Sequence, residues 1–309
     1  MQIYLPIAET SVNIVLFLGV GAAIGFISGL LGVGGGFLMT PLLIFLGIPP
    51  AIAVATSANQ IIASSVSGFI AHWRRNAVDF KMATMLSIGG IMGALLGIWL
   101  FDILARSGQT ELLVSLLYVV CLGTVGTLML IESIQAIRRT RAGQPMPARQ
   151  SGQHYWLHGL PFKMRFRRSK LYISALAPLV IGFGIGLLTA TMGVAGGFVL
   201  VPALIYLLYM PTSVVLGTSL LQAIVVTSIV TILHAVSTRS VDLVLAALLI
   251  VGGVIGAQLG ARAGLKLRAE ELRALLAGLV LAVAVRLAIT LFLPPDDLYS
   301  VVTTPLPKQ

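Results

Sequence analysis

The chain has 309 residues, of which 58% are hydrophobic and only 10% are charged, and its mean hydropathy is +1.02. A soluble domain is about one quarter charged, so this composition excludes a soluble globular enzyme, a disordered chain and a secreted disulfide scaffold. The net charge of +10 is concentrated between Ser133 and Lys170, which hold nine basic residues and no acidic one. The apolar stretches are continuous and do not alternate, so the sequence predicts an all-α polytopic membrane protein and not a barrel.

Ten apolar segments of the chain are expected to be helical. In chain order they are 12–31, 36–48, 51–71, 82–101, 111–137, 171–191, 196–209, 213–235, 241–263 and 271–293. No basic region precedes the first of them, so we expect a retained transmembrane helix and not a signal peptide. The segments 36–48 and 196–209 are too short for a full crossing, and each follows a glycine cluster. This pattern is typical of broken helices at a transport site, either as crossings or as re-entrant segments.

The two halves of the chain repeat each other. Motifs of the first half recur in the same order in the second, at an offset of 161 to 163 residues. The matched groups are Gly32-Val33-Gly34-Gly35-Gly36-Phe37 and Gly193-Val194-Ala195-Gly196-Gly197-Phe198, Pro41 and Pro202, Thr56-Ser57 and Thr218-Ser219, Gln60 and Gln222, His72 and His234, Asp79 and Asp242, and Gly89-Gly90 and Gly252-Gly253. We therefore predict a first transmembrane repeat at 12–137, a basic linker at 138–170 and a second repeat at 171–293. Five segments in each repeat would make the two repeats inverted about the membrane plane.

The basic linker sets the expected orientation. Lys and Arg collect on the cytoplasmic side of membrane proteins, so the linker is expected in the cytoplasm and both termini in the periplasm. We expect the linker to contact anionic lipid headgroups and not nucleic acid. Aromatic residues interleave with its basic ones, which favours a short interfacial helix near Trp156, Phe162 and Phe166.

The glycine motif and the residues after it resemble a known family. The run from Gly25 to Gly36, followed by Pro41 and by Ala55-Thr56-Ser57, is similar to the TauE/SafE family of membrane permeases, often called sulfite exporters. The resemblance covers about Ile14 to Leu291 except the linker. It implies export of a small sulfur-containing anion, such as sulfite, sulfoacetate or another organosulfonate, across a bacterial inner membrane. The second copy departs from the pattern at Ala195 and has Leu221 where the first has Asn59.

The two glycine clusters are candidate cradles for the anion. A glycine-rich helix start exposes backbone N–H groups that lack intrahelical partners, and the helix dipole favours negative charge there. The candidate residues are Gly32, Gly34, Gly35, Gly36, Gly193, Gly196 and Gly197. The alternative is close helix packing through small residues. For Gly89-Gly90, with Gly93 and Gly97, and for the matching glycines of the second half, packing is the favoured interpretation.

Neutral hydrogen-bonding side chains follow each glycine cluster. They are Thr56, Ser57, Asn59 and Gln60 in the first half, and Thr218, Ser219 and Gln222 in the second. A neutral site can hold an anion and still release it, so these residues are candidate substrate ligands. Hydrogen bonding between helices or to the local backbone is the alternative.

Several ionisable residues occur within or beside the apolar segments. His72 and His234 are candidates for proton coupling, with an interfacial position as the alternative. Arg286 is expected either to attract the anion or to extend to the outer interface. Asp79 and Asp242 precede helices and are predicted to be N-terminal caps.

The sequence contains no catalytic, cofactor-binding or metal-binding motif. It has no phosphate-binding loop, no H-E-x-x-H motif and no cysteine pair, so we expect no enzyme activity, no cofactor and no metal. The leading hypothesis is a secondary transporter, working by alternating access with the anion held at helix N-termini near the midplane. An anion channel, or a transporter of another small anion such as a carboxylate, is the alternative. A homo-oligomer is compatible with either.

Overall fold

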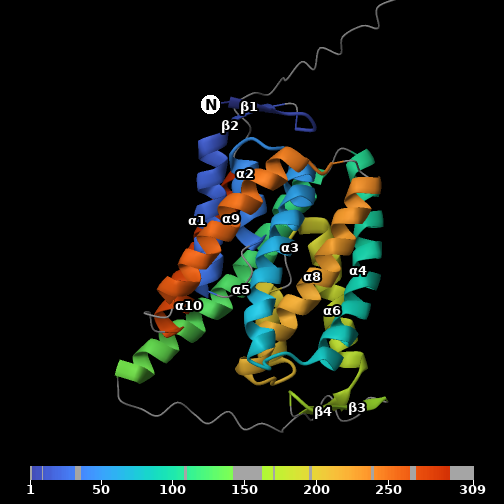
Figure 1. Cartoon of the computed structure of the whole chain (residues 1–309), viewed down its shortest axis with the longest axis vertical. Helices are drawn as coiled ribbons and strands as arrows, with labels where there is room; N and C mark the ends of the chain where they lie inside the picture. Colours follow the sequence, from blue (N-terminus) through green and yellow to red (C-terminus); the bar gives the residue numbers. More distant parts are fainter. Residues whose placement is uncertain are drawn as a thin grey trace, which may run out of the picture.

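The chain folds into a bundle of long and short helices with a two-stranded hairpin at each end (Figure 1). The computed structural model describes residues 2–8, 10–31, 36–107, 110–141, 162–169, 171–194, 197–237, 240–264 and 269–292. In these residues the elements are β1 Gln2–Leu5, β2 Thr10–Asn13, α1 Ile14–Leu31, α2 Gly36–Phe45, α3 Pro50–Arg74, α4 Phe80–Arg106, α5 Thr110–Arg141, β3 Lys163–Phe166, β4 Leu171–Ser174, α6 Leu176–Met192, α7 Gly197–Tyr206, α8 Thr212–Ser237, α9 Leu243–Gly264 and α10 Ala269–Phe292. The predicted all-α membrane fold is confirmed.

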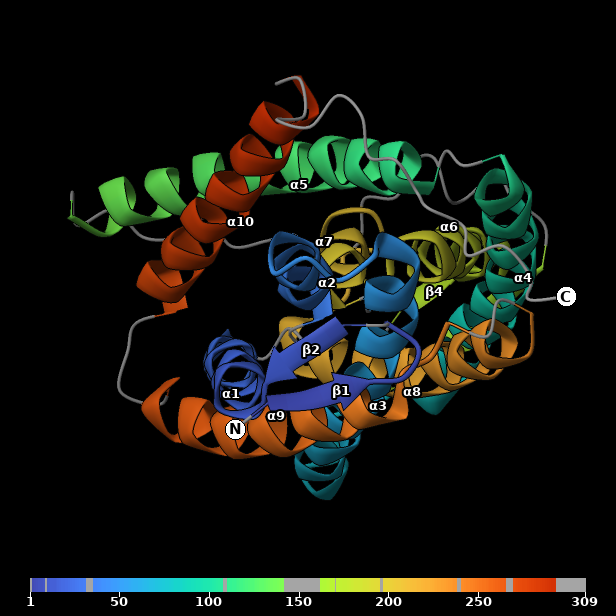
Figure 2. The same cartoon turned by 90° about the horizontal axis from the view of Figure 1, so that it is seen from above.

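Five of the described helices are long and apolar enough to cross a membrane, namely α4, α5, α8, α9 and α10. The helices α2 and α7 have ten residues each. They lie within the segments 36–48 and 196–209, which were predicted to be too short for a full crossing. At about 1.5 Å of rise per residue, each is roughly half as long as a bilayer is thick. Figure 2 shows α2 and α7 inside a ring made by the longer helices.

The two hairpins were not predicted, and one of them corrects an expectation. An antiparallel hairpin joins β1 to β2, and a second joins β3 to β4. The second hairpin lies where an interfacial helix was expected. Phe162 directly precedes β3 and Phe166 is its last residue, while Trp156 lies outside the described residues. The strand Lys163–Phe166 alternates charged and apolar residues and buries Phe166, a period that suits a strand and not a helix. This hairpin also spans the predicted boundary between the linker and the second repeat.

Glycine-lined contacts join helices of different halves. The helix α1 packs along α9, and α4 packs along α6. A Cβ added to Gly25 would overlap the backbone of Gly253, and one added to Gly186 would overlap the backbone of Gly90. The same holds for Gly89, Gly93, Gly252 and Gly256, which lie against the backbone of the facing helix. Close packing is therefore confirmed as the role of these glycines.

Each hairpin is packed against its own part of the core. Leu5 and Val12 of the first hairpin belong to a cluster with residues of α1, α2, α3, α5, α9 and α10. Phe166 and Ile173 of the second belong to a cluster with residues of α4, α6, α7 and α8. In Figure 1 the two hairpins lie at opposite ends of the molecule, so α1 and α6 begin at opposite ends.

Candidate functional site

The helices α3 and α8, which occupy matching places in the two halves, cross and pack against each other. Ile61 of α3 and Ala223 of α8 form a buried pair of their own, and these two residues occupy matching places in the two halves. Gln60 and Gln222 directly precede them. The fold therefore brings the two duplicated glutamines to the same helix crossing.

Both glutamine side chains are buried without partners. Gln60 is 1% exposed and Gln222 is 0% exposed. Neither the oxygen nor the nitrogen of either side-chain amide has a hydrogen-bond partner among the described residues. A buried polar group left unpaired costs roughly 1–3 kcal/mol, and native interiors pair nearly all such groups. Two unpaired amides at matching positions are therefore the candidates for contact with a polar ligand.

Glycines of neighbouring helices lie against the two amides. An added Cβ at Gly253 of α9 would stand 2.6 Å from Gln60 Nε2, and one at Gly90 of α4 would stand 3.2 Å from Gln222 Nε2. The second glycine of each Gly-Gly pair therefore faces a glutamine, while the first contacts another helix backbone. A side chain at either position would press on the amide.

Ser57 links α3 to the end of α6. Its Oγ lies 2.7 Å from Thr40 Oγ1, 3.0 Å from the carbonyl oxygen of Val54 and 3.4 Å from that of Gly193. Gly193 ends α6 with a φ of 69°, in the left-handed region that favours glycine. A Cβ there would also meet Val54 and Ser57. Gly193 is thus required by a turn and by a close approach to α3.

The other predicted polar ligands have partners within the protein. Thr56 Oγ1 accepts a hydrogen bond from the backbone N–H of Asp242, and Thr218 Oγ1 accepts one from that of Asp79. Ser219 Oγ donates to the carbonyl of Leu216 at 2.9 Å. Asn59, which is half-buried, donates to the carbonyl of Ala55 at 3.5 Å. Of the seven neutral candidates, Gln60 and Gln222 are thus the pair whose polar atoms have no described partner.

The glycine clusters lie mainly between described elements. Gly32, Gly34, Gly35 and Gly196 fall outside the described residues. Gly36 is the first residue of α2 and Gly197 the first of α7. Both clusters therefore precede short helices, and backbone binding of an anion there stays a prediction.

The candidate ionisable residues lie apart from the glutamine pair. His72 is in the last turn of α3, beside Gly217 of α8. His234 is fully buried, with Nε2 3.0 Å from the carbonyl oxygen of Ala190 and its ring edge-on to Phe101. Arg286 is exposed on α10, with its guanidinium 4.3 Å from the centre of the Phe45 ring, which is a cation–π contact.

The two aspartates cap helices, as predicted. Asp79 Oδ1 accepts a hydrogen bond from the backbone N–H of Met82 in the first turn of α4. Asp242 Oδ1 accepts from those of Val244 and Leu245 in the first turn of α9. The sequence did not indicate the partners of the second carboxylate oxygens, nor any role for Thr40 or Tyr118. In the structure the Tyr118 hydroxyl donates to the carbonyl of Met192 at 2.7 Å.

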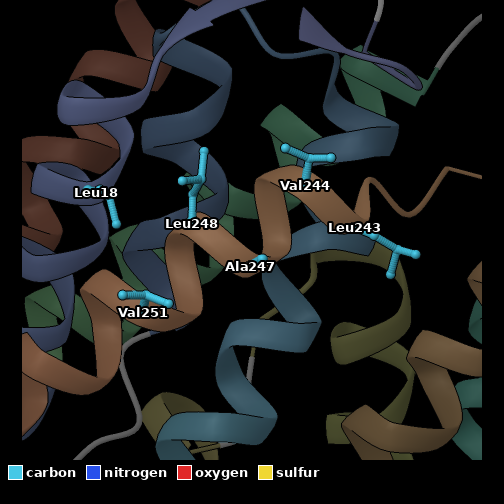
Figure 3. A pocket seen from close by; sticks show the side chains of 6 residues that line it. All are labelled: Leu18, Leu243, Val244, Ala247, Leu248 and Val251. Atoms are coloured by element: carbon cyan, nitrogen blue, oxygen red, sulfur yellow. The ribbon is translucent and has the colours of Figure 1, made fainter. Parts of the chain in front are cut away.

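An open groove between α1 and α9 has different chemistry (Figure 3). Its lining residues are Leu18, Leu243, Val244, Ala247, Leu248 and Val251. These aliphatic side chains offer no hydrogen-bond donor to an anion. The groove is therefore suited to acyl chains and is not a candidate substrate site.

The bundle of apolar helices, with two short helices inside it, is that of a polytopic membrane protein, and related sequences identify the class as a membrane transporter. The family model "Sulfite exporter TauE/SafE" matches residues 17–287. The probable membrane transporter protein YjnA of Bacillus subtilis is 31% identical over 279 residues, which cover 90% of this chain and 99% of that protein.

A probable membrane transporter protein of Xylella fastidiosa is 34% identical, over 80% of this chain and 84% of its own length. The sulfite exporter TauE/SafE family protein 3 of Arabidopsis thaliana is 29% identical over 130 residues, which are 40% of this chain and 27% of that protein. No solved structure matches. The chain belongs to the sulfite exporter TauE/SafE family, and its relatives are named as transporters and not as enzymes.

Proposed function

We propose that this protein is a secondary transporter that exports a small sulfur-containing anion, bound where α3 crosses α8. The observation that carries the proposal is the pair of buried, unpartnered amides of Gln60 and Gln222. Each amide nitrogen brings two N–H donors. Two such groups at one crossing match an anion whose several oxygens each accept a hydrogen bond.

Neutral ligands suit the task of a transporter. A hydrogen bond to a charged ligand is worth roughly 1.5–3 kcal/mol, so a few of them hold an anion reversibly. The short helices α2 and α7 begin at glycine clusters, and the positive ends of their dipoles favour negative charge. Backbone N–H groups at Gly36 and Gly197, and in the clusters before them, would complete the ligand set.

The substrate class is proposed from chemistry and from the family. Sulfite and organosulfonates share a sulfur atom that carries three oxygens, and the family description names sulfite export. Such a group can receive donors from both halves of the protein at once. A carboxylate has two oxygens and would leave more of the donors unpaired, which disfavours it.

The same arrangement supports alternating access between two inverted repeats. The hairpins that precede α1 and α6 lie at opposite ends of the molecule (Figure 1), and the site lies at the crossing between the repeats, where inverted-repeat transporters bind their substrates. In the proposed orientation, in the bacterial inner membrane, the basic linker is cytoplasmic and both termini are periplasmic.

Flux measurements with the purified protein in liposomes test the proposal. Vesicles loaded with sulfite or sulfoacetate should show saturable uptake of labelled anion and accumulation by counterflow. Formate and acetate, tested at the same concentration, should compete weakly. Flux that does not saturate and shows no counterflow would establish a channel, and equal competition by carboxylates would overturn the substrate class.

A further inference from the structure

A chain of hydrogen bonds links the first hairpin to the site helix α3. Asp242, in front of α9, donates its backbone N–H to Thr56 Oγ1 at 3.2 Å. Asp242 Oδ2 accepts a hydrogen bond at 3.1 Å from the backbone N–H of Ile7, in the turn between β1 and β2. Asp242 and Thr56 are both 0% exposed. We call Ile7, Asp242 and Thr56 the first latch.

A second chain repeats this arrangement at the other end of the molecule. The backbone N–H of Asp79 donates to Thr218 Oγ1 of α8 at 3.0 Å. Asp79 Oδ2 accepts from the backbone N–H of Ser169 at 3.0 Å and from its hydroxyl at 2.7 Å. Ser169 lies in the turn between β3 and β4 and is buried. We call Ser169, Asp79 and Thr218 the second latch.

Helix capping alone does not account for these carboxylates. A cap needs one acceptor oxygen, and Oδ1 of each aspartate serves that purpose. The second oxygen bonds a hairpin from the other half of the chain in both cases. A neutral cap such as serine would hold the helix start and release the hairpin.

The latches also connect the hairpins to the proposed site. Thr56 and Thr218 precede Gln60 and Gln222 by four residues, one helical turn away on the same face of α3 and of α8. A movement of either site helix away from the neighbouring aspartate must therefore break a latch. In this structure both latches are closed.

We propose that Asp242 and Asp79 are positioning residues that hold the two hairpins as gates at opposite ends of the transport path. Opening of one end requires its hairpin to leave its aspartate, while the latch at the other end stays closed. The inference rests on the proposed function because it supposes alternating access. Figure 2 shows the first hairpin crossing the end of the bundle where α1 and α9 begin.

A cysteine introduced at a buried position on each hairpin tests its latch separately. Val12 on β2 is 7% exposed and Ile173 on β4 is 2% exposed, and they occupy matching strand positions. Single cysteines at these positions, in a Cys121→Ala background, report hairpin opening by their rate of reaction with a maleimide. The protein is labelled in detergent without substrate, so neither topology nor transport affects the reading.

Asp→Asn variants break the latch and keep the cap. Asparagine is as good a cap as aspartate, but its amide has one acceptor where the carboxylate has two. Asp242→Asn should speed labelling of Val12→Cys about tenfold or more, because a buried bond to a charged acceptor is lost, and leave Ile173→Cys unchanged. Asp79→Asn should do the reverse. Asp102→Asn, the same change near the far end of α4, is the control and should alter neither rate.

The outcomes separate a latch from a merely structural role. Equal acceleration of both reporters in either variant, or acceleration of neither, would overturn the proposal. If an Asn variant does not purify as a monodisperse protein, Ser169→Ala removes only the 2.7 Å bond and should speed Ile173→Cys alone. Flux in liposomes is measured in parallel. If labelling is selective but the liposomes show no counterflow, the latches are supported and the proposed secondary transport is refuted.

Discussion

Replacement of Gln60 or Gln222 by methionine separates a ligand site from a structural one. Methionine is unbranched, has nearly the volume of glutamine and forms helices equally well, so the substitution removes the amide and little else. Both glutamines are buried with no described partner for either amide atom. The variants therefore lose no hydrogen bond within the described residues.

The expected effect on stability follows from that unpaired state. An unpaired buried polar group costs roughly 1–3 kcal/mol, although polar pairs measured within membranes average only about 0.6 kcal/mol. The empty variants should therefore be as stable as the parent, or more stable by up to about 3 kcal/mol. Anion affinity should fall about tenfold to hundredfold, because a bond to a charged ligand is worth roughly 1.5–3 kcal/mol.

Thermal unfolding with and without sulfite measures both quantities on one sample, and liposome flux gives the functional consequence. Gln258→Met is the matched control, because Gln258 is exposed on α9 and its loss should alter neither quantity. A lower melting temperature of the empty variants, with the stabilisation by sulfite unchanged, would refute the reasoning and assign the two glutamines to packing.

Three further predictions concern the rest of the fold. Single cysteines at Gln2 and Gln144, in a Cys121→Ala background, should react with an impermeant maleimide from opposite sides of the membrane; labelling from one side would refute the orientation. Gly25→Ala should lower the melting temperature, because its Cβ would overlap the α9 backbone, whereas Gly19→Ala, with open space around it, should be neutral or stabilising by up to about 1 kcal/mol. Gly34→Ala should weaken stabilisation by sulfite more than it alters the empty protein, and the opposite result would exclude a backbone cradle.

The helices could be predicted from the sequence because most of the apolar stretches are continuous and long enough to cross a membrane. The glycines at 89, 93 and 97 repeat every four residues, so they share one face, and the structure places that face against α6. The short helices followed from glycine clusters and from their length. The hairpins were missed because each strand has only four residues, although Lys163–Phe166 carries a period of two that was available.

The site could be predicted only in part. Duplication in the sequence singled out Gln60 and Gln222 together with the neighbouring threonines and serines. The sequence could not separate the glutamines from the threonines and serines, because whether a polar side chain is paired depends on groups far away in the chain. Thr56 finds its partner in Asp242, which is 186 residues away, while the glutamines find none among the described residues.

The exchange of helix partners between the halves has a consequence for biosynthesis. The glycine face of α1 packs against α9, which begins more than 210 residues after α1 ends. At a synthesis rate of roughly 5–20 residues per second, α1 waits about 10–40 s in the membrane before its partner is made. The first half released alone would keep the partner faces of α1 and α4 uncovered, which makes it a substrate for quality-control proteases. Co-expression of the two halves as separate chains, divided within the linker, supplies each face with its partner and should restore an assembled transporter.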